Sequence, residues 1–371
     1  MNSDDDYWMM LAVGQASRSI GLTSPNPPVG AVVVKEGNVI GQGRHRQAGG
    51  PHAEIEALRD AAARGHDVRG STIYVTLEPC STQGRTPPCT DALVKAGVAE
   101  VVYGATDPNP KHAGAADSVL RAAGIAVAKG VLRTECERLI QPFTRWIRSG
   151  LPYVVAKVGQ TLDGRLTRPP GESQWITSDL SREHAMGLRV SYDAILIGAE
   201  TLRKDNPRLT LRGDQIPSEK QQPWRIVVTR SGILPKKSHL FTDEYKDRTL
   251  VLRGDFTFDE LLRELAAREI ASVLVEGGGS LLGQAFSSRS VDEVVWYIAP
   301  RICGGGTLAV GGVGFPQDAA SASLRDVWYE NIGDDLCVHG YPIWDSDAPP
   351  RIVPPSKERK LASVHVPDPV S

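Results

Sequence analysis

The sequence predicts a two-domain α/β protein, and three observations carry that prediction. Runs of β-branched residues alternate with amphipathic or alanine-rich segments, which is typical of a sheet covered by helices. The alternation runs through the first 149 residues and starts again after the short break Ser149-Gly150-Leu151-Pro152. The length of 371 residues, at about 150 residues per domain, also corresponds to roughly two domains.

The elements of the first domain follow from two periodicities. Apolar residues at helical spacing and alanine-rich stretches predict helices at residues 7–20, 52–64, 90–96, 115–123 and 132–147. Runs of β-branched residues predict strands at 29–34, 39–42, 71–77, 98–103 and 125–128. The first two strands flank the turn Gly37-Asn38 and form a predicted hairpin. Because strands and helices then alternate, we expect an α/β domain with a largely parallel sheet over residues 1–148.

The second domain is expected over residues 153–344. Its strand candidates are residues 153–158, 194–197, 225–229, 249–252, 271–275 and 291–298. Its clearest helices are residues 181–190 and 258–268. The stretch 346–371 holds six prolines and few large apolar residues. Residues 345–371 are therefore expected to form a Pro-rich, disordered tail.

Composition excludes several classes of protein. Lys plus Arg is 42 and Asp plus Glu is 44, a net charge of −2, so no strong field attracts nucleic acid or an anionic membrane. No run of 18 apolar residues predicts a membrane span. The acidic N-terminus has no apolar core of the signal-peptide type, so we expect a cytoplasmic protein. Five scattered cysteines are too few, and odd in number, for a disulfide framework.

The most specific chemical signal is His52-Ala53-Glu54 followed by Pro79-Cys80 and then Cys89. A catalytic zinc takes three protein ligands and keeps one position for water, and His52, Cys80 and Cys89 supply that set. Zinc lowers the pKa of water, so hydroxide can form at neutral pH. Glu54 is then expected to move a proton from that water to a leaving amine.

Two other interpretations of the same residues stay open at this point. The zinc-deaminase signature is H-x-E…P-C-x-x-C, whereas here eight residues separate Cys80 from Cys89. A structural zinc would need a fourth ligand, for which His45, His66 and His112 are candidates. The cysteines could also be buried core residues without a metal.

The long insertion between the cysteines resembles the zinc loop of the bifunctional deaminase–reductases of riboflavin biosynthesis. Further motifs that are similar to this family's occur in its order and spacing. They are Asn26-Pro27-Pro28-Val29-Gly30, Pro51-His52-Ala53-Glu54, Asp107-Pro108-Asn109-Pro110, Lys157, Leu162-Asp163-Gly164-Arg165, Glu172-Ser173-Gln174-Trp175-Ile176-Thr177, Leu188-Arg189, Asp193-Ala194-Ile195-Leu196-Ile197-Gly198, Val275-Glu276-Gly277-Gly278-Gly279 and Ile298-Ala299-Pro300. The resemblance runs from about residue 5 to about residue 344.

The resemblance implies a fold for each domain and two successive reactions. A cytidine-deaminase-like, three-layer N-terminal domain with one zinc ion would deaminate 2,5-diamino-6-ribosylamino-4(3H)-pyrimidinone 5′-phosphate. A dihydrofolate-reductase-like C-terminal domain would use NADPH to reduce the ribosyl group, giving 5-amino-6-ribitylaminouracil 5′-phosphate. The partner is then a small pyrimidine ribosyl phosphate, with neither nucleic acid nor membrane, and the family suggests a homodimer.

The resemblance also implies residues for the reductase site. The substrate contacts carried over by motif are Ser173, Arg189, Leu209, Arg212 and Glu276. The cofactor contacts are Gly159, Trp175, Thr201, Asp205 and Gly278. The next cofactor contact is either Arg230 or Ser231. Lys157 and Asp163 are either electrostatic or proton-relay groups or members of structural ion pairs, and Thr82 and Gln83 stand where many members carry histidine.

The residues alone leave two rival functions to test. A nucleic-acid base deaminase with a binding module would show a basic or aromatic-rich surface. A non-catalytic zinc-stabilised binding protein would have no need of Glu54. Release of ammonia without NADPH, followed by oxidation of NADPH, separates the bifunctional enzyme from both.

Overall fold

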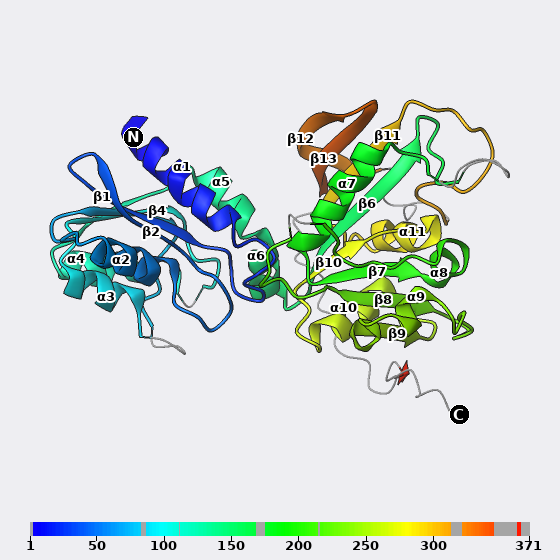
Figure 1. Ribbon diagram of the computed structural model, residues 1–371, viewed down its shortest axis with the longest axis horizontal. Helices are drawn as coiled ribbons and strands as arrows, with labels where there is room; N and C mark the ends of the chain where they lie inside the picture. The colour runs from blue at the N-terminus through cyan, green and yellow to red at the C-terminus, as the bar shows by residue number, and fades with distance from the viewer. Residues whose placement is uncertain are drawn as a thin grey trace. The chain divides into compact units, whose positions relative to one another are not determined.

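The computed structural model describes residues 3–82, 87–110, 112–167, 175–213, 216–312, 321–344 and 362–364. The chain divides into two compact units, Met1–Gly150 and Leu151–Ser371. Each unit is built on one sheet with helices against it (Figure 1). The expectation of two α/β sheets is confirmed.

The first unit contains a five-stranded sheet in the order β2-β1-β3-β4-β5. Its strands are β1 (Gly30–Lys35), β2 (Asn38–Arg44), β3 (Thr72–Leu77), β4 (Glu100–Ala105) and β5 (Ala126–Lys129). The predicted hairpin is confirmed, since β1 pairs antiparallel with β2. Strand β1 is also antiparallel to β3, and only β3, β4 and β5 run parallel. The sheet is therefore mixed, where the alternation predicted a largely parallel one.

Helices cover both faces of this sheet. The β-branched residues of β3 and β4 point alternately to the two faces and are therefore buried on both. The helices are α1 (Ser3–Ser17), α2 (Ala53–Ala63), α3 (Cys89–Ala96), α4 (Ala115–Ala122), α5 (Arg133–Leu139) and α6 (Gln141–Ser149). Helices α1 and α5 contact each other on one face, while α2, α3 and α4 lie along the other (Figure 1). Glycines let α2 come close to β2, since a Cβ on Gly43 would lie 2.3 Å from the Ala57 nitrogen.

The prediction of a single helix over residues 132–147 is wrong, because two helices, α5 and α6, occupy that stretch. The break falls at Ile140, whose φ of −105° and ψ of 14° leave the helical region. Pro142 lies in the first turn of α6. Proline has no N–H for the helix ladder, and its ring clashes with the carbonyl four residues earlier, so one helix must end and the next begin here.

The second unit contains a nine-stranded sheet in the order β12-β13-β11-β6-β10-β7-β8-β9-β14. Its strands are β6 (Tyr153–Thr161), β7 (Ala194–Gly198), β8 (Trp224–Thr229), β9 (Thr249–Arg253), β10 (Ser272–Val275), β11 (Glu293–Ala299), β12 (Ser323–Ile332), β13 (Asp335–Ile343) and β14 (Ala362–Val364). The strands from β11 to β9 in that order run parallel. The carboxyl ends of β6, β10 and β7 therefore meet at one edge, which is where open α/β sheets bind ligands.

The helices of this unit are α7 (Asp179–Leu188), α8 (Ala199–Asp205), α9 (His239–Thr242), α10 (Phe258–Ala266) and α11 (Gly279–Ser287). Helix α7 begins two residues earlier than predicted, because Ser178 caps it by accepting a hydrogen bond from the Ser181 amide. Apart from β14, which pairs with β9, the predicted disordered tail at 345–371 lies outside the described residues. Among the described helices, none is long and apolar enough to cross a membrane.

Candidate active sites

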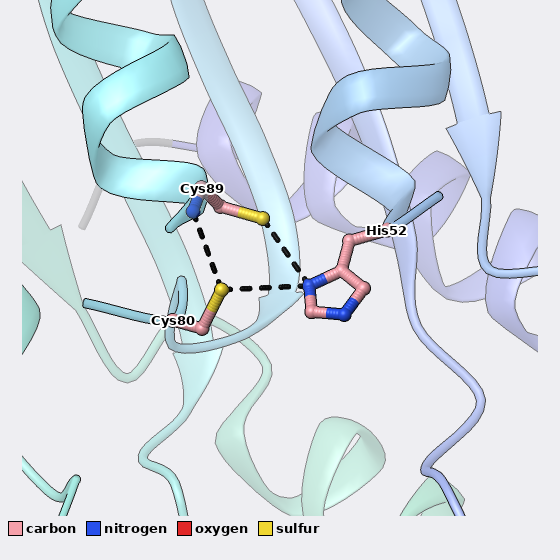
Figure 2. A group of neighbouring side chains, drawn as sticks. All are labelled: His52, Cys80 and Cys89. Carbon is pink, nitrogen blue, oxygen red and sulfur yellow. Dashed lines mark hydrogen bonds between the residues drawn. The ribbon is translucent and has the colours of Figure 1, made fainter. Parts of the chain in front are cut away.

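The first unit brings His52, Cys80 and Cys89 together at the ends of three elements. His52 is the N-cap of α2, Cys89 is the first residue of α3, and Cys80 lies in the loop after β3. The His52 Nδ1 atom lies 3.5 Å from the Cys80 Sγ and 3.3 Å from the Cys89 Sγ (Figure 2). All three ligand atoms lie within 4.8 Å of one another, and the described residues contain no other such group.

The donor set fits zinc. One imidazole nitrogen and two sulfurs are borderline-to-soft ligands of the kind that zinc prefers. The Cys89 amide donates a 3.2 Å hydrogen bond to the Cys80 sulfur. Hydrogen bonds from Cys89 and His52 lower the pKa of Cys80, whereas the hydrogen bond with Cys80 and burial raise the pKa of Cys89. A bound cation would favour the thiolate form of both sulfurs.

Of the three candidate fourth ligands, none joins the group. His45 uses both ring nitrogens: Nδ1 lies 2.9 Å from the Pro51 carbonyl and Nε2 lies 3.2 Å from the Asn26 amide. Burial lowers the pKa of His45, so a neutral ring that donates to Pro51 and accepts from Asn26 satisfies both contacts. His66 is exposed, and His112 contacts the Thr82 hydroxyl. A three-ligand set leaves a position open, which is the arrangement of a catalytic zinc rather than a structural one.

A cavity of about 190 Å³ opens beside these ligands. Its lining comprises Asn26, Pro27, Val29, His45, His52, Glu54, Leu77, Glu78, Cys80, Asp107 and Phe143. Glu54, on the first turn of α2, is only 3% exposed, and burial raises its pKa. A buried carboxyl group two residues from a ligand, facing a small cavity, is placed to exchange protons with a bound molecule.

Glu78, which also lines the cavity, is a site residue that the sequence motifs do not predict. Its carboxylate accepts hydrogen bonds from the backbone amides of Asp107 at 3.2 Å, Gly114 at 3.0 Å and Ala116 at 3.2 Å. It therefore holds the loop that carries Asp107 against the cavity. Its place directly before Pro79-Cys80 was the available signal, since a carboxylate beside a ligand motif often orients the site.

In the second unit, Arg189 and Glu276 form a buried ion pair. The Arg189 Nε lies 2.6 Å from Oε1 of Glu276, and its second terminal nitrogen lies 2.9 Å from Oε2. The Lys157 Nζ lies 3.8 Å from the same carboxylate. The three residues come from β6, from the end of α7 and from the loop after β10, and they meet at the carboxyl edge of the sheet.

The charges in this cluster are strongly coupled. Burial opposes ionisation of Glu276, but the positive charges of Arg189 and Lys157 lower its pKa to about 2. Burial lowers the pKa of Lys157, and Glu276 opposes that change. With Arg189 and Lys157 both protonated, two positive charges face one negative charge, so the cluster can attract an anionic group.

Thr201 and Gly278 line a second cavity, of about 410 Å³. A Cβ on Gly277 or Gly278 would lie 3.3 or 3.4 Å from the Thr201 hydroxyl, and both glycines have positive φ, 131° and 71°. The two glycines therefore let the backbone approach α8 closely at the start of α11. Arg230 and Ser231 both line this cavity, so the choice between them stays open.

The other predicted cofactor contacts lie outside this lining. Gly159 is on β6, where a Cβ would lie 3.3 Å from the Thr177 methyl group. Trp175 is 52% exposed and lies 4.7 Å from the Arg182 guanidinium. Asp205 is the exposed last residue of α8. The structure thus groups only Thr201 and Gly278 among the five.

The remaining predicted residues have varied surroundings. Leu209 is 2% exposed, so its side chain faces the core, and Arg212 is exposed. Ser173 and Gln83 lie outside the described residues. Asp163 accepts hydrogen bonds from the Thr161 hydroxyl and from the amides of Cys303 and Gly304. Asp163 therefore anchors a loop, and among the described residues it forms an ion pair with Arg165 at 3.8 Å.

Replacing Cys80 with serine is expected to remove zinc, because a hydroxyl is a poor substitute for a thiolate ligand. Deamination should be lost with the metal. Reduction of supplied deaminated intermediate should persist, since the Arg189–Glu276 cluster belongs to the other compact unit. Metal content and the two activities of the purified variant check this result. Full zinc occupancy in the variant would contradict the ligand assignment.

Sequence profiles of two families match the chain in the same order as its two units. The cytidine and deoxycytidylate deaminase zinc-binding region matches residues 2–105, and the RibD C-terminal domain matches residues 152–338. The first match covers the His52 and Cys80 motifs, and the second covers Arg189 and Glu276. The two matches agree with the fold expected for each unit.

Full-length relatives show the same arrangement. Riboflavin biosynthesis protein RibD of Aquifex aeolicus is 40% identical over 354 residues, covering 90% of this chain and 97% of its own. The Escherichia coli protein of that name is 38% identical over 366 residues, covering 90% and 98%. Acinetobacter baumannii RibD has a solved structure with a TM-score of 0.80 at 35% identity, covering 92% and 99%.

A further solved structure carries both activities in its name. It is a Thermotoga maritima diaminohydroxyphosphoribosylaminopyrimidine deaminase/5-amino-6-(5-phosphoribosylamino)uracil reductase. Its TM-score is 0.81 at 34% identity, and the match covers 92% of this chain and 99% of that chain.

Proposed function

The chain belongs to the RibD family, the bifunctional deaminase–reductases of riboflavin biosynthesis, and from that premise we propose its substrates and the residues that act on them. The first substrate is 2,5-diamino-6-ribosylamino-4(3H)-pyrimidinone 5′-phosphate, and the final product is 5-amino-6-ribitylaminouracil 5′-phosphate. The convergence of one imidazole and two thiols beside the buried Glu54 carries this proposal. Zinc in the deaminase unit and NADPH in the reductase unit are the cofactors of the two reactions.

In the deaminase, residues 1–148, we propose that His52, Cys80 and Cys89 hold zinc. Zinc, when bound, supplies the Lewis acidity that activates water at neutral pH. The Glu54 carboxylate takes a proton from the attacking water and delivers it to the leaving amino group. Asn26, His45 and Asp107 line the cavity and can orient the pyrimidine through hydrogen bonds.

In the reductase, residues 153–344, we propose that Arg189, Glu276, Ser173, Leu209 and Arg212 hold the ribosyl phosphate. Gly159, Trp175, Thr201, Asp205 and Gly278 hold the nicotinamide nucleotide. NADPH, when bound, supplies the hydride. The chain's residues bring the sugar carbon to it and keep it oriented, which is where a protein accelerates a cofactor reaction.

The family also supports expectations about the whole protein: its location, its oligomeric state and the kind of substrate it takes. We propose that it acts as a cytoplasmic homodimer on a small molecule. A nucleic-acid substrate is disfavoured by the net charge of −2. A non-catalytic zinc protein is disfavoured by the buried Glu54 beside the open zinc position.

A two-step assay tests the proposal. The purified full-length protein should release ammonia from the diaminopyrimidinone phosphate without NADPH. Addition of NADPH should then lead to its oxidation in proportion to the deaminated intermediate. Ammonia release that required NADPH, or NADPH oxidation with the unreacted substrate alone, would contradict two separate sites acting in that order.

A further inference from the structure

Residues 208–211 form a segment of irregular backbone between α8 and β8, here named the 208–211 segment. It carries Leu209 and directly precedes Arg212, two of the proposed substrate contacts. Leu209 has a φ of 52°, a conformation that a branched side chain rarely adopts. Its side chain is 2% exposed and packs with Leu202 and Val227. Packing therefore anchors the segment at Leu209. The unfavourable backbone conformation of this residue must be stabilised by further contacts of the segment.

Side chains supply that support, because the segment takes part in none of the described strands. The Gln222 side chain accepts a 2.7 Å hydrogen bond from the Leu211 amide and donates a 3.2 Å bond to the Leu211 carbonyl. Arg225 donates to the Arg208 carbonyl at 3.1 Å. Arg189 donates to the Thr210 carbonyl at 3.3 Å. Three side chains thus hold backbone groups at three of the four residues.

Arg225 is itself rigidly held. It is 1% exposed, although it lies in the β-branched strand β8. Its partners are the Arg208 carbonyl, the Leu240 carbonyl at 3.0 Å, the Thr249 hydroxyl at 3.1 Å and the two Asp243 carboxylate oxygens at 2.6 and 2.8 Å. These five contacts use all five N–H groups of a guanidinium. A lysine has three donors on a flexible stem and cannot reproduce this fork.

The segment is also tied to the ion pair at the sheet edge. Arg189, which donates to the Thr210 carbonyl, forms the paired hydrogen bonds to Glu276. A shift of the 208–211 segment would therefore move Arg212 and disturb Arg189 together. Both are proposed to contact the substrate, whereas Thr201 and Gly278 line a separate cavity to which no residue of this segment contributes.

We infer that Gln222 and Arg225 are positioning residues of the reductase: they hold the 208–211 segment in the conformation that binds the sugar phosphate, and neither touches the cofactor cavity. This inference rests on the proposed function. Replacing either residue should therefore weaken binding of the deaminated intermediate and leave binding of NADPH unchanged. A purely structural role would instead lower stability and disturb both ligands.

The test is Gln222→Ala in the full-length protein, assayed with NADPH and 5-amino-6-(5-phosphoribosylamino)uracil. Removing two hydrogen bonds should raise KM for the intermediate by about tenfold. KM for NADPH, the deaminase rate and the melting temperature should stay close to wild type. Gln222→Glu should give a smaller rise, since a carboxylate still accepts from the Leu211 amide but cannot donate to the carbonyl.

Gln221→Ala is the matched control. Among the described residues, the hydrogen-bond partner of this exposed neighbour is Arg248, at 3.4 Å, and it has none in the segment. Arg225→Lys is a second test of the inference. We expect it to raise KM for the intermediate more than Gln222→Ala does. An unchanged KM for the intermediate in Gln222→Ala, or an equal rise in both KM values with a fall in melting temperature, would overturn the inference. A wild-type protein that never reduced the intermediate would overturn the proposed function and this inference with it.

Discussion

Replacing Glu54 with glutamine is expected to lower the rate of deamination by about 10²–10⁴-fold, the usual contribution of a positioned acid–base group. Glutamine has nearly the same shape but cannot accept and return a proton. Zinc should remain bound, because His52, Cys80 and Cys89 make up the ligand set without Glu54. Metal analysis and ammonia release from the same preparation check both parts of the result.

Glu56→Gln is the matched control for this substitution. Glu56 lies on the same turn of α2, but its side chain is 20% exposed and pairs with Arg59 and Arg46 at the surface. Its removal should leave deamination within about twofold, since exposed ion pairs contribute little. Loss of zinc from Glu54→Gln would show that Glu54 is a ligand. Retention of full deaminase activity would show that another group moves the proton.

The zinc site could be predicted from the sequence because its parts are local. His52 and Glu54 share the start of one helix, and Cys80 and Cys89 flank one loop, so short motifs carry nearly all the geometry. The Arg189–Glu276 pair is different. These residues lie 87 positions apart. They meet only because β10 inserts between β6 and β7. The strand order is a property of the whole sheet, and no local pattern specifies it.

Other features escaped prediction for reasons of packing. Strands β12 and β13 were not predicted. Strand β12 lies at the sheet edge with mostly exposed residues and three charged side chains, so it lacks a buried apolar run. Arg225 would be taken as the solvent-facing residue of a strand, yet it is almost fully buried. Its burial depends on Asp243, on the Arg208 carbonyl of a loop and on the Leu240 carbonyl of α9, which only the folded chain brings together.

Replacing Arg189 with methionine is expected to destabilise the second unit by about 3–5 kcal/mol, because it leaves the Glu276 carboxylate buried with Lys157 as its one remaining cationic partner among the described residues. The side chains of Arg189 and Glu276 are 14% and 8% exposed, so water cannot compensate. At about 2–4 °C per kcal/mol, the melting temperature of this unit should fall by roughly 6–20 °C. Reduction should be lost, while deamination at 25 °C persists, since its ligands belong to the first unit.

The double variant Arg189→Met/Glu276→Leu separates stability from function. Replacing both members of a buried ion pair with apolar residues is often neutral or stabilising. Burial already lowers the pKa of Lys157, so this group can lose its charge when its partner is removed. The melting temperature should therefore recover most of its loss, while reduction stays absent because the anion-binding charges are gone. A double variant that reduced the intermediate normally would show that the pair serves only the fold.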